Sequence, residues 1–122
     1  MIDNQSDTES NIEFNAEVLE QIVEQLPPGM AQQLFDKLTQ ECSRLLAILK
    51  DDSLNVDDTA SAAHEFKGML LNFGLVRASS IAAEIEYGRK PVSEITMDVQ
   101  RLETAVAQGT QQAQSVLNNS GS

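Results

Sequence analysis

Apolar residues recur every three or four positions along most of this chain, and this helical period limits its fold more than any other feature. The pattern covers segments at about 15–26, 28–49, 57–73, 75–87 and 93–117. No segment alternates apolar and polar residues over the length of a strand. Helices joined by short links favour antiparallel neighbours. The chain is therefore predicted to be all-α, an up-down antiparallel four-helix bundle with an additional short N-terminal helix.

Helix-breaking residues place the ends of these segments. Asn15 is expected to cap the first helix and Pro27-Pro28 to stop it, with the second proline in the first turn of the next helix. Gly74 is expected as the residue that follows the third helix, and Gly88 is expected to end the fourth. Gly109 is expected to weaken the middle of the last helix by roughly 1 kcal/mol relative to Ala.

Length and composition limit the domain organisation, the partners and the location. The 122 residues fit one domain, predicted at 12–117 between a disordered acidic tail at 1–11 and a disordered tail at 118–122. A net charge of -11 disfavours nucleic-acid binding, which needs a basic face. No apolar stretch reaches ~18–20 residues, the N-terminus lacks the regions of a signal peptide, and the single Cys42 cannot form an internal disulfide. These features predict a cytoplasmic protein without a membrane span.

The chain has one histidine, His64, on the third predicted helix. At about 100° per residue it lies about 160° from Phe66, whose direction the other bulky apolar residues of that helix share, so His64 is predicted to face solvent. Two neighbours on the same face are unfavourable or neutral for folding. Gly68, as a mid-helix glycine, costs roughly 1 kcal/mol against Ala, and an exposed Leu71 adds no folding stability. A flat surface kept around one reactive side chain predicts the docking of another protein. The residues that share its face are Ala60, Ser61, Lys67, Gly68 and Leu71.

The residue types favour phosphoryl chemistry. An unperturbed imidazole has a pKa of ~6.5, so a neutral nucleophilic nitrogen is available near neutral pH, and attack on a phosphoryl group forms a reactive N–P bond. Lys67, one turn from His64, is placed to meet the phosphoryl oxygens. No paired carboxylate or cysteine is evident near the histidine, so neither a metal site nor any other cofactor is predicted.

The segment Ala63-His64-Glu65-Phe66-Lys67-Gly68, with Gly74 ten residues after the histidine, resembles the signature of histidine-containing phosphotransfer (HPt) domains. The upstream segment from Glu13-Phe14-Asn15 to Leu26-Pro27 and the downstream segment Ile81–Glu86 are also similar to that family, so the resemblance covers about 12–105.

The resemblance implies that His64 accepts a phosphoryl group from a sensor histidine kinase or its receiver domain and passes it to an aspartate of a response-regulator receiver domain. In the family, the lysine that matches Lys67 assists electrostatically, and the glycine that matches Gly68 leaves room for the phosphoryl group. The required Mg²⁺ belongs to the receiver domain. Arg77, just after the Gly74 turn, is a further candidate for the docking face. We expect a free-standing monomer without kinase activity of its own.

Two alternatives remain open from the residues alone. A non-catalytic helical adaptor would use Ala60, Gly68 and Leu71 as a groove for a signalling partner, with His64 incidental. A hydrolase with His64 as general base would need a second titratable group at catalytic spacing, and the sequence shows none.

Overall fold

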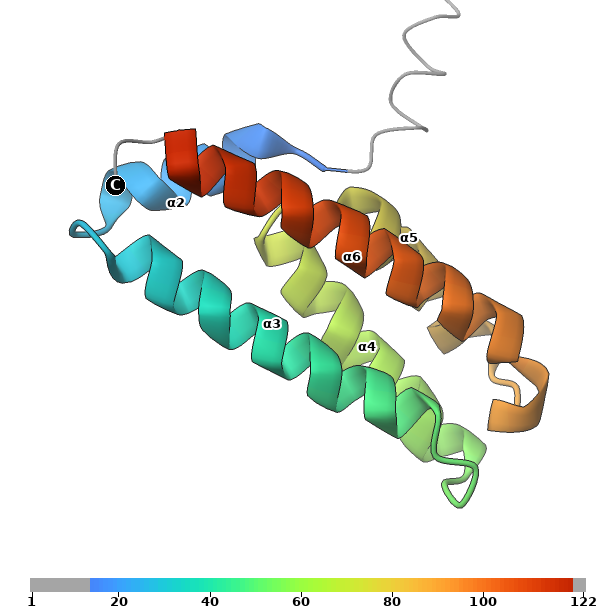
Figure 1. Ribbon diagram of the computed structural model, residues 1–122. Coiled ribbons are helices and arrows are strands. Elements are labelled where there is room, and N and C mark those ends of the chain that lie inside the picture. Colours follow the sequence, from blue (N-terminus) through green and yellow to red (C-terminus); the bar gives the residue numbers. More distant parts are fainter. Residues whose placement is uncertain (1–13, 120–122) are drawn as a thin grey trace, which may run out of the picture.

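The computed structural model describes residues 14–119, and this part of the chain is helical without strands. A short helix, α2 (Ala16–Gln25), precedes four longer ones (Figure 1). These are α3 (Met30–Leu49), α4 (Val56–Asn72), α5 (Val76–Gly88) and α6 (Thr96–Asn119), with one turn of 3-10 helix, η1 (Val92–Glu94), before α6. The predicted all-α class and the additional N-terminal helix are confirmed.

The four long helices run alternately up and down and close into a bundle (Figure 1). α4 packs most extensively on α5, α5 packs on α6, and α3 packs on both α4 and α6. α2 packs across α6 and α3. This is the predicted bundle. The helix that carries His64, α4, thus makes its most extensive contact with α5.

The core lies between the four helices. Phe66 and Leu70 of α4, Leu45 of α3 and Leu102 of α6 are completely buried in it. Cys42 is also buried, and burial, with the nearby Glu41 charge, raises the pKa of its thiol to about 12. The cysteine therefore serves as a small apolar residue of the core.

The connection between α2 and α3 differs from the prediction. Asn15 caps α2 as expected, because its side chain accepts a hydrogen bond from the Glu17 N–H at 3.1 Å. Pro28, however, does not begin α3. The two prolines and Gly29 form a turn in which the Met30 N–H donates to the Pro27 carbonyl, and Gly29 takes a φ of +84°. The reversal of the chain needs a left-handed residue, which moves the start of α3 to Met30.

Gly88 ends α5 as predicted: it is the last helical residue, and Arg89 after it takes the left-handed conformation, with a φ of +48°. The ends of α6 differ in detail. α6 begins at Thr96 rather than near 93, because η1 occupies the preceding residues. It ends at Asn119, two residues past the predicted end of the domain. The predicted tail at 1–11 and residues 120–122 lie outside the described residues.

Gly74 ties the α4–α5 turn to the start of α2. Its φ is +82°, as expected for the residue after a helix, and its carbonyl accepts a hydrogen bond from the Asn15 N–H at 2.7 Å. A Cβ atom at this position would lie 2.5 Å from the Asn15 carbonyl oxygen. Glycine is thus required here both by the backbone conformation and by the close approach of α2.

Gly109 has a role that the sequence does not predict. A Cβ atom there would lie 2.9 Å from both Cγ and Cδ2 of Leu75, a fully buried side chain. The glycine therefore lets α6 approach the start of α5 closely, which offsets its low helix propensity.

In the described part of the chain no helix is both long and apolar enough to cross a membrane.

Candidate functional site

His64 lies in the middle of α4 with its side chain 67% exposed. The opposite side of the helix, with Ala63, Phe66 and Leu70 fully buried, faces the core. The ring therefore projects from the outer surface of the bundle, as the helical wheel predicts.

A carboxylate from α5 contacts the imidazole. Glu86 Oε2 lies 2.8 Å from His64 Nδ1, and Glu86 Oε1 lies 2.9 Å from Lys67 Nζ. One carboxylate thus joins both residues predicted for the phosphoryl chemistry. The expectation that no carboxylate lies near His64 was wrong, because the partner stands 22 residues away in sequence. The sequence did contain a signal for this contact. In an antiparallel pair of helices, residues at similar distances from the connecting turn face each other. His64 stands ten residues before Gly74, and Glu86 stands twelve residues after it.

Lys67 points toward α5. Its ammonium group donates to the Tyr87 hydroxyl at 3.1 Å and lies 4.9 Å from the centre of the Tyr87 ring. Together with the Glu86 ion pair, these contacts leave the lysine side chain only 20% exposed. The lysine is therefore held beside the histidine, one helical turn away, rather than extended into solvent.

The charges of these side chains stabilise one another. The hydrogen bond from Lys67 lowers the pKa of Glu86 most, and His64 adds to this against the opposing effect of desolvation. Glu86 in turn is the largest cause that raises the pKa of Lys67, followed by Tyr87. At neutral pH the carboxylate is ionised and the lysine protonated. An ionised carboxylate only accepts hydrogen bonds, so in the neutral imidazole Nδ1 of His64 carries the proton and Nε2 has the free lone pair.

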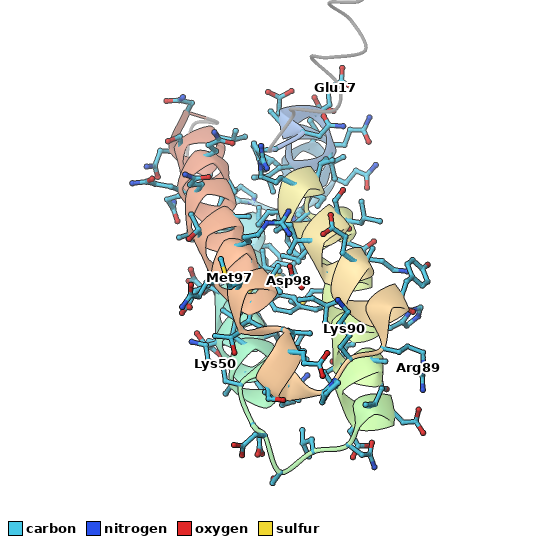
Figure 2. All side chains as sticks on the ribbon, turned by 90° about the vertical axis from the view of Figure 1, so that its right-hand side faces the viewer. Glu17, Lys50, Arg89, Lys90, Met97 and Asp98 are labelled. Atoms are coloured by element: carbon cyan, nitrogen blue, oxygen red, sulfur yellow. The ribbon has the colours of Figure 1, made fainter. Side chains whose placement is uncertain are left out.

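The surface beside the histidine is a shallow hollow of about 390 Å³. Ser61 and Ala60 both line it. Ser61 is exposed, as expected, whereas Ala60 is only 6% exposed, so it forms part of the floor rather than an open surface. Tyr87 and Arg89, which the sequence interpretation missed, line the same hollow, and Arg89 forms an ion pair with Asp57. Figure 2 shows Arg89 at the end of α5, on the side away from α6.

Gly68 and Leu71 continue this surface along α4. Apart from the neighbouring backbone of α4 itself, nothing would lie within 4 Å of a Cβ atom at Gly68, so this position faces open space. Leu71 is 50% exposed. Both residues are therefore open to solvent on the helix that carries His64.

Arg77 is not brought to the site. It lines a different hollow between α5 and α6, together with Met97 and Arg101. Glu86 stands nine positions after Arg77, which is two and a half helical turns, so the two side chains leave α5 on opposite sides. The structure therefore places Arg77 away from the hollow beside His64. Among the described residues, no group of three or more His, Cys, Asp or Glu side chains is arranged to hold a metal ion.

Comparison with known families identifies the Hpt domain over residues 8–115 of the chain. The protein belongs to the Hpt domain family. Hpt domains are histidine phosphotransfer intermediates of two-component phosphorelays, not autonomous kinases, and they interact with histidine kinases and receiver domains. The predicted family, fold and general function are confirmed, and this favours phosphotransfer over the adaptor and hydrolase alternatives. Comparisons with curated proteins and with solved structures found no match.

Proposed function

We propose that His64 is the phosphoryl carrier of this Hpt domain and that Nε2 is the atom phosphorylated. The observation that carries the proposal is the contact between Nδ1 and Glu86 at 2.8 Å, which leaves Nε2 as the free nucleophile of an exposed ring. The chain has no other histidine.

The proposed transfer follows from this geometry. The Nε2 lone pair attacks the phosphorus of a receiver phosphoaspartate, an N–P bond forms, and the P–O bond breaks with its electron pair on the aspartate carboxylate. The positive charge that develops on the ring is stabilised by Glu86, which accepts the Nδ1–H hydrogen bond. In the onward step the N–P bond breaks, its electron pair returns to Nε2, and an aspartate oxygen of the next receiver bonds to phosphorus.

Lys67 and Gly68 are proposed to serve the phosphoryl group. The lysine ammonium lies one helical turn from His64, where phosphoryl oxygens compete with Glu86 for it. The bare backbone at Gly68 leaves room for the group and for the docked receiver domain.

The partners are proposed to be a sensor histidine kinase or its receiver domain as donor, and a response-regulator receiver domain as acceptor, with Mg²⁺ bound by the receiver. We further propose that the protein acts as a monomer in the cytoplasm and binds no nucleic acid. The net charge of -11 supports the last point, because it repels a phosphate backbone.

The test is to incubate the native protein and His64→Gln with a panel of ³²P-labelled receiver domains and kinases. Label is expected on the native protein alone, lost in acid and kept in alkali. Label that remains on His64→Gln, or no label from any donor, would overturn the proposal. If His64→Gln kept partner binding and the cellular phenotype, the adaptor alternative would be favoured instead.

A further inference from the structure

Tyr87 stands out among the exposed side chains near the site. It is 70% exposed at the end of α5, directly after Glu86, and it is the only tyrosine in a chain that has no tryptophan. Solvent-exposed aromatic side chains of this size add little to folding, whereas tyrosine is enriched among the residues that dominate binding energy in protein interfaces.

The ring is held in place before any partner arrives. Lys67 donates to its hydroxyl at 3.1 Å and lies 4.9 Å from the ring centre, and the lysine is itself fixed by its ion pair with Glu86. A side chain that is already ordered loses little conformational freedom when it is covered, so it contributes more of its contact energy to affinity.

The position of Tyr87 beside His64 indicates which partner protein would bind over it. Tyr87 and His64 line the same hollow. A receiver domain that exchanges a phosphoryl group with Nε2 must bring its aspartate oxygen within bonding distance of the phosphorus, and so must cover the surface that surrounds the histidine. The partner that fits this surface is therefore the receiver domain itself.

We propose that Tyr87 is the preordered anchor for receiver-domain docking, and that it acts on the binding of the receiver rather than on the chemical step. This inference rests on the proposed role of His64, but it concerns affinity, which is measured separately from phosphorylation.

The test uses the receiver domain that accepts the phosphoryl group of the native protein fastest. Native protein and variants are loaded chemically with potassium phosphoramidate, and transfer rates are followed against receiver concentration. Tyr87→Ala is expected to raise KM about 30-fold with kcat within about threefold, the size of a strong interface residue. Tyr87→Phe keeps the ring and is expected to stay within about threefold of native in both constants.

Met97→Ala is the matched control. Met97 is 74% exposed, on α6, and lines the hollow between α5 and α6. Figure 2 shows α5 between Met97 and Arg89, which lines the hollow beside His64. The KM of this variant is expected to equal that of the native protein. An unchanged KM for Tyr87→Ala, an equal rise for Met97→Ala, or a loss confined to kcat would overturn the inference.

A second readout does not depend on phosphorylation. Because the chain has one tyrosine, protein labelled with ¹³C-tyrosine gives the ring signals of Tyr87 alone. Addition of the unlabelled receiver domain is expected to shift or broaden them, and unchanged signals at saturating receiver would contradict the anchor. The two proposals can fail separately. If neither phosphoramidate nor any receiver phosphorylated His64, but the Tyr87 signals still shifted on addition of the receiver, the proposal that His64 carries the phosphoryl group would be overturned and the docking role of Tyr87 would be supported.

Discussion

Two glycines in the middle of long helices, Gly68 on α4 and Gly109 on α6, show how one residue type serves two purposes. A Cβ at Gly109 would lie 2.9 Å from Leu75, whereas a Cβ at Gly68 would meet nothing within 4 Å. Each glycine lowers helix propensity by roughly 1 kcal/mol. At Gly109 close packing offsets this cost, while at Gly68 no contact within the protein does. The comparison supports the role proposed for Gly68, which is to leave room for the phosphoryl group and the docked receiver domain.

Gly74→Ala is expected to have the largest effect on stability. The left-handed backbone and the contact of the new Cβ with the Asn15 carbonyl, at 2.5 Å, together lower the free energy of unfolding by about 3 kcal/mol. Urea denaturation measures this loss. Gly29→Ala is the matched control, because Gly29 has a φ of +84° but no neighbour within 4 Å. Its expected loss of about 1–2 kcal/mol in the free energy of unfolding comes from the left-handed backbone alone. Equal losses for both variants would contradict a contact with α2.

Gly109→Ala tests the packed side of the comparison. The new methyl group must displace the buried Leu75 side chain, which costs more than alanine gains in helix propensity. The net result is a free energy of unfolding lower by about 1 kcal/mol, with phosphotransfer kinetics unchanged, since Leu75 lies in the core. A more stable variant would show that α6 does not need the glycine to pack.

Gly68→Ala tests the open side and is expected to change stability in the opposite direction. Nothing obstructs the new methyl group, so alanine raises the free energy of unfolding by about 1 kcal/mol. Transfer between receiver and protein is expected to slow about 10- to 100-fold, because the methyl group displaces the docked partner near His64. A variant that is more stable and equally fast would remove the functional explanation of this glycine.

The smallest expected effect is the dependence of stability on pH through Glu86. Its pKa is lowered, chiefly by Lys67 and then by His64, so its ionised form stabilises the fold above the usual carboxyl range, and this contribution disappears as the pH falls through the lowered pKa. Glu86→Gln is therefore expected to be less stable than native at pH 7, and the difference should close as the pH falls below the lowered pKa of Glu86.

Urea denaturation across this range measures the effect. Glu84→Gln serves as the control, because Glu84 lies on the same helix but forms its ion pair with Arg101, away from the site. A gap between Glu86→Gln and native that persists at low pH would contradict the ionised pair.

The features that the sequence predicts well are local. The helical period fixes the five helices, and Asn15 and Gly74 act within a few residues of the helix ends that they define. The exposure of His64 follows from the angle between residues of one helix. The local rules failed at Pro28, because Gly29 takes the left-handed conformation and α3 begins only at Met30.

The features that it misses depend on how α4 meets α5. Glu86 and Tyr87 reach His64 and Lys67 only through that contact, and Ala60 is buried although it shares the wheel position of exposed residues. The position of Arg77 likewise depends on which side of α5 faces α6. Helical periodicity describes one helix at a time, so it identifies the histidine and its own helix but not the carboxylate that orients it.

The central claim, that Nε2 of His64 carries the phosphoryl group, is tested most directly by heteronuclear NMR of the protein loaded with potassium phosphoramidate. We predict one phosphohistidine signal in the ³¹P spectrum, with couplings to the ring protons on both sides of Nε2, and its complete absence in His64→Gln. A phosphorus signal coupled through Nδ1, or one that survives in His64→Gln, would contradict the account.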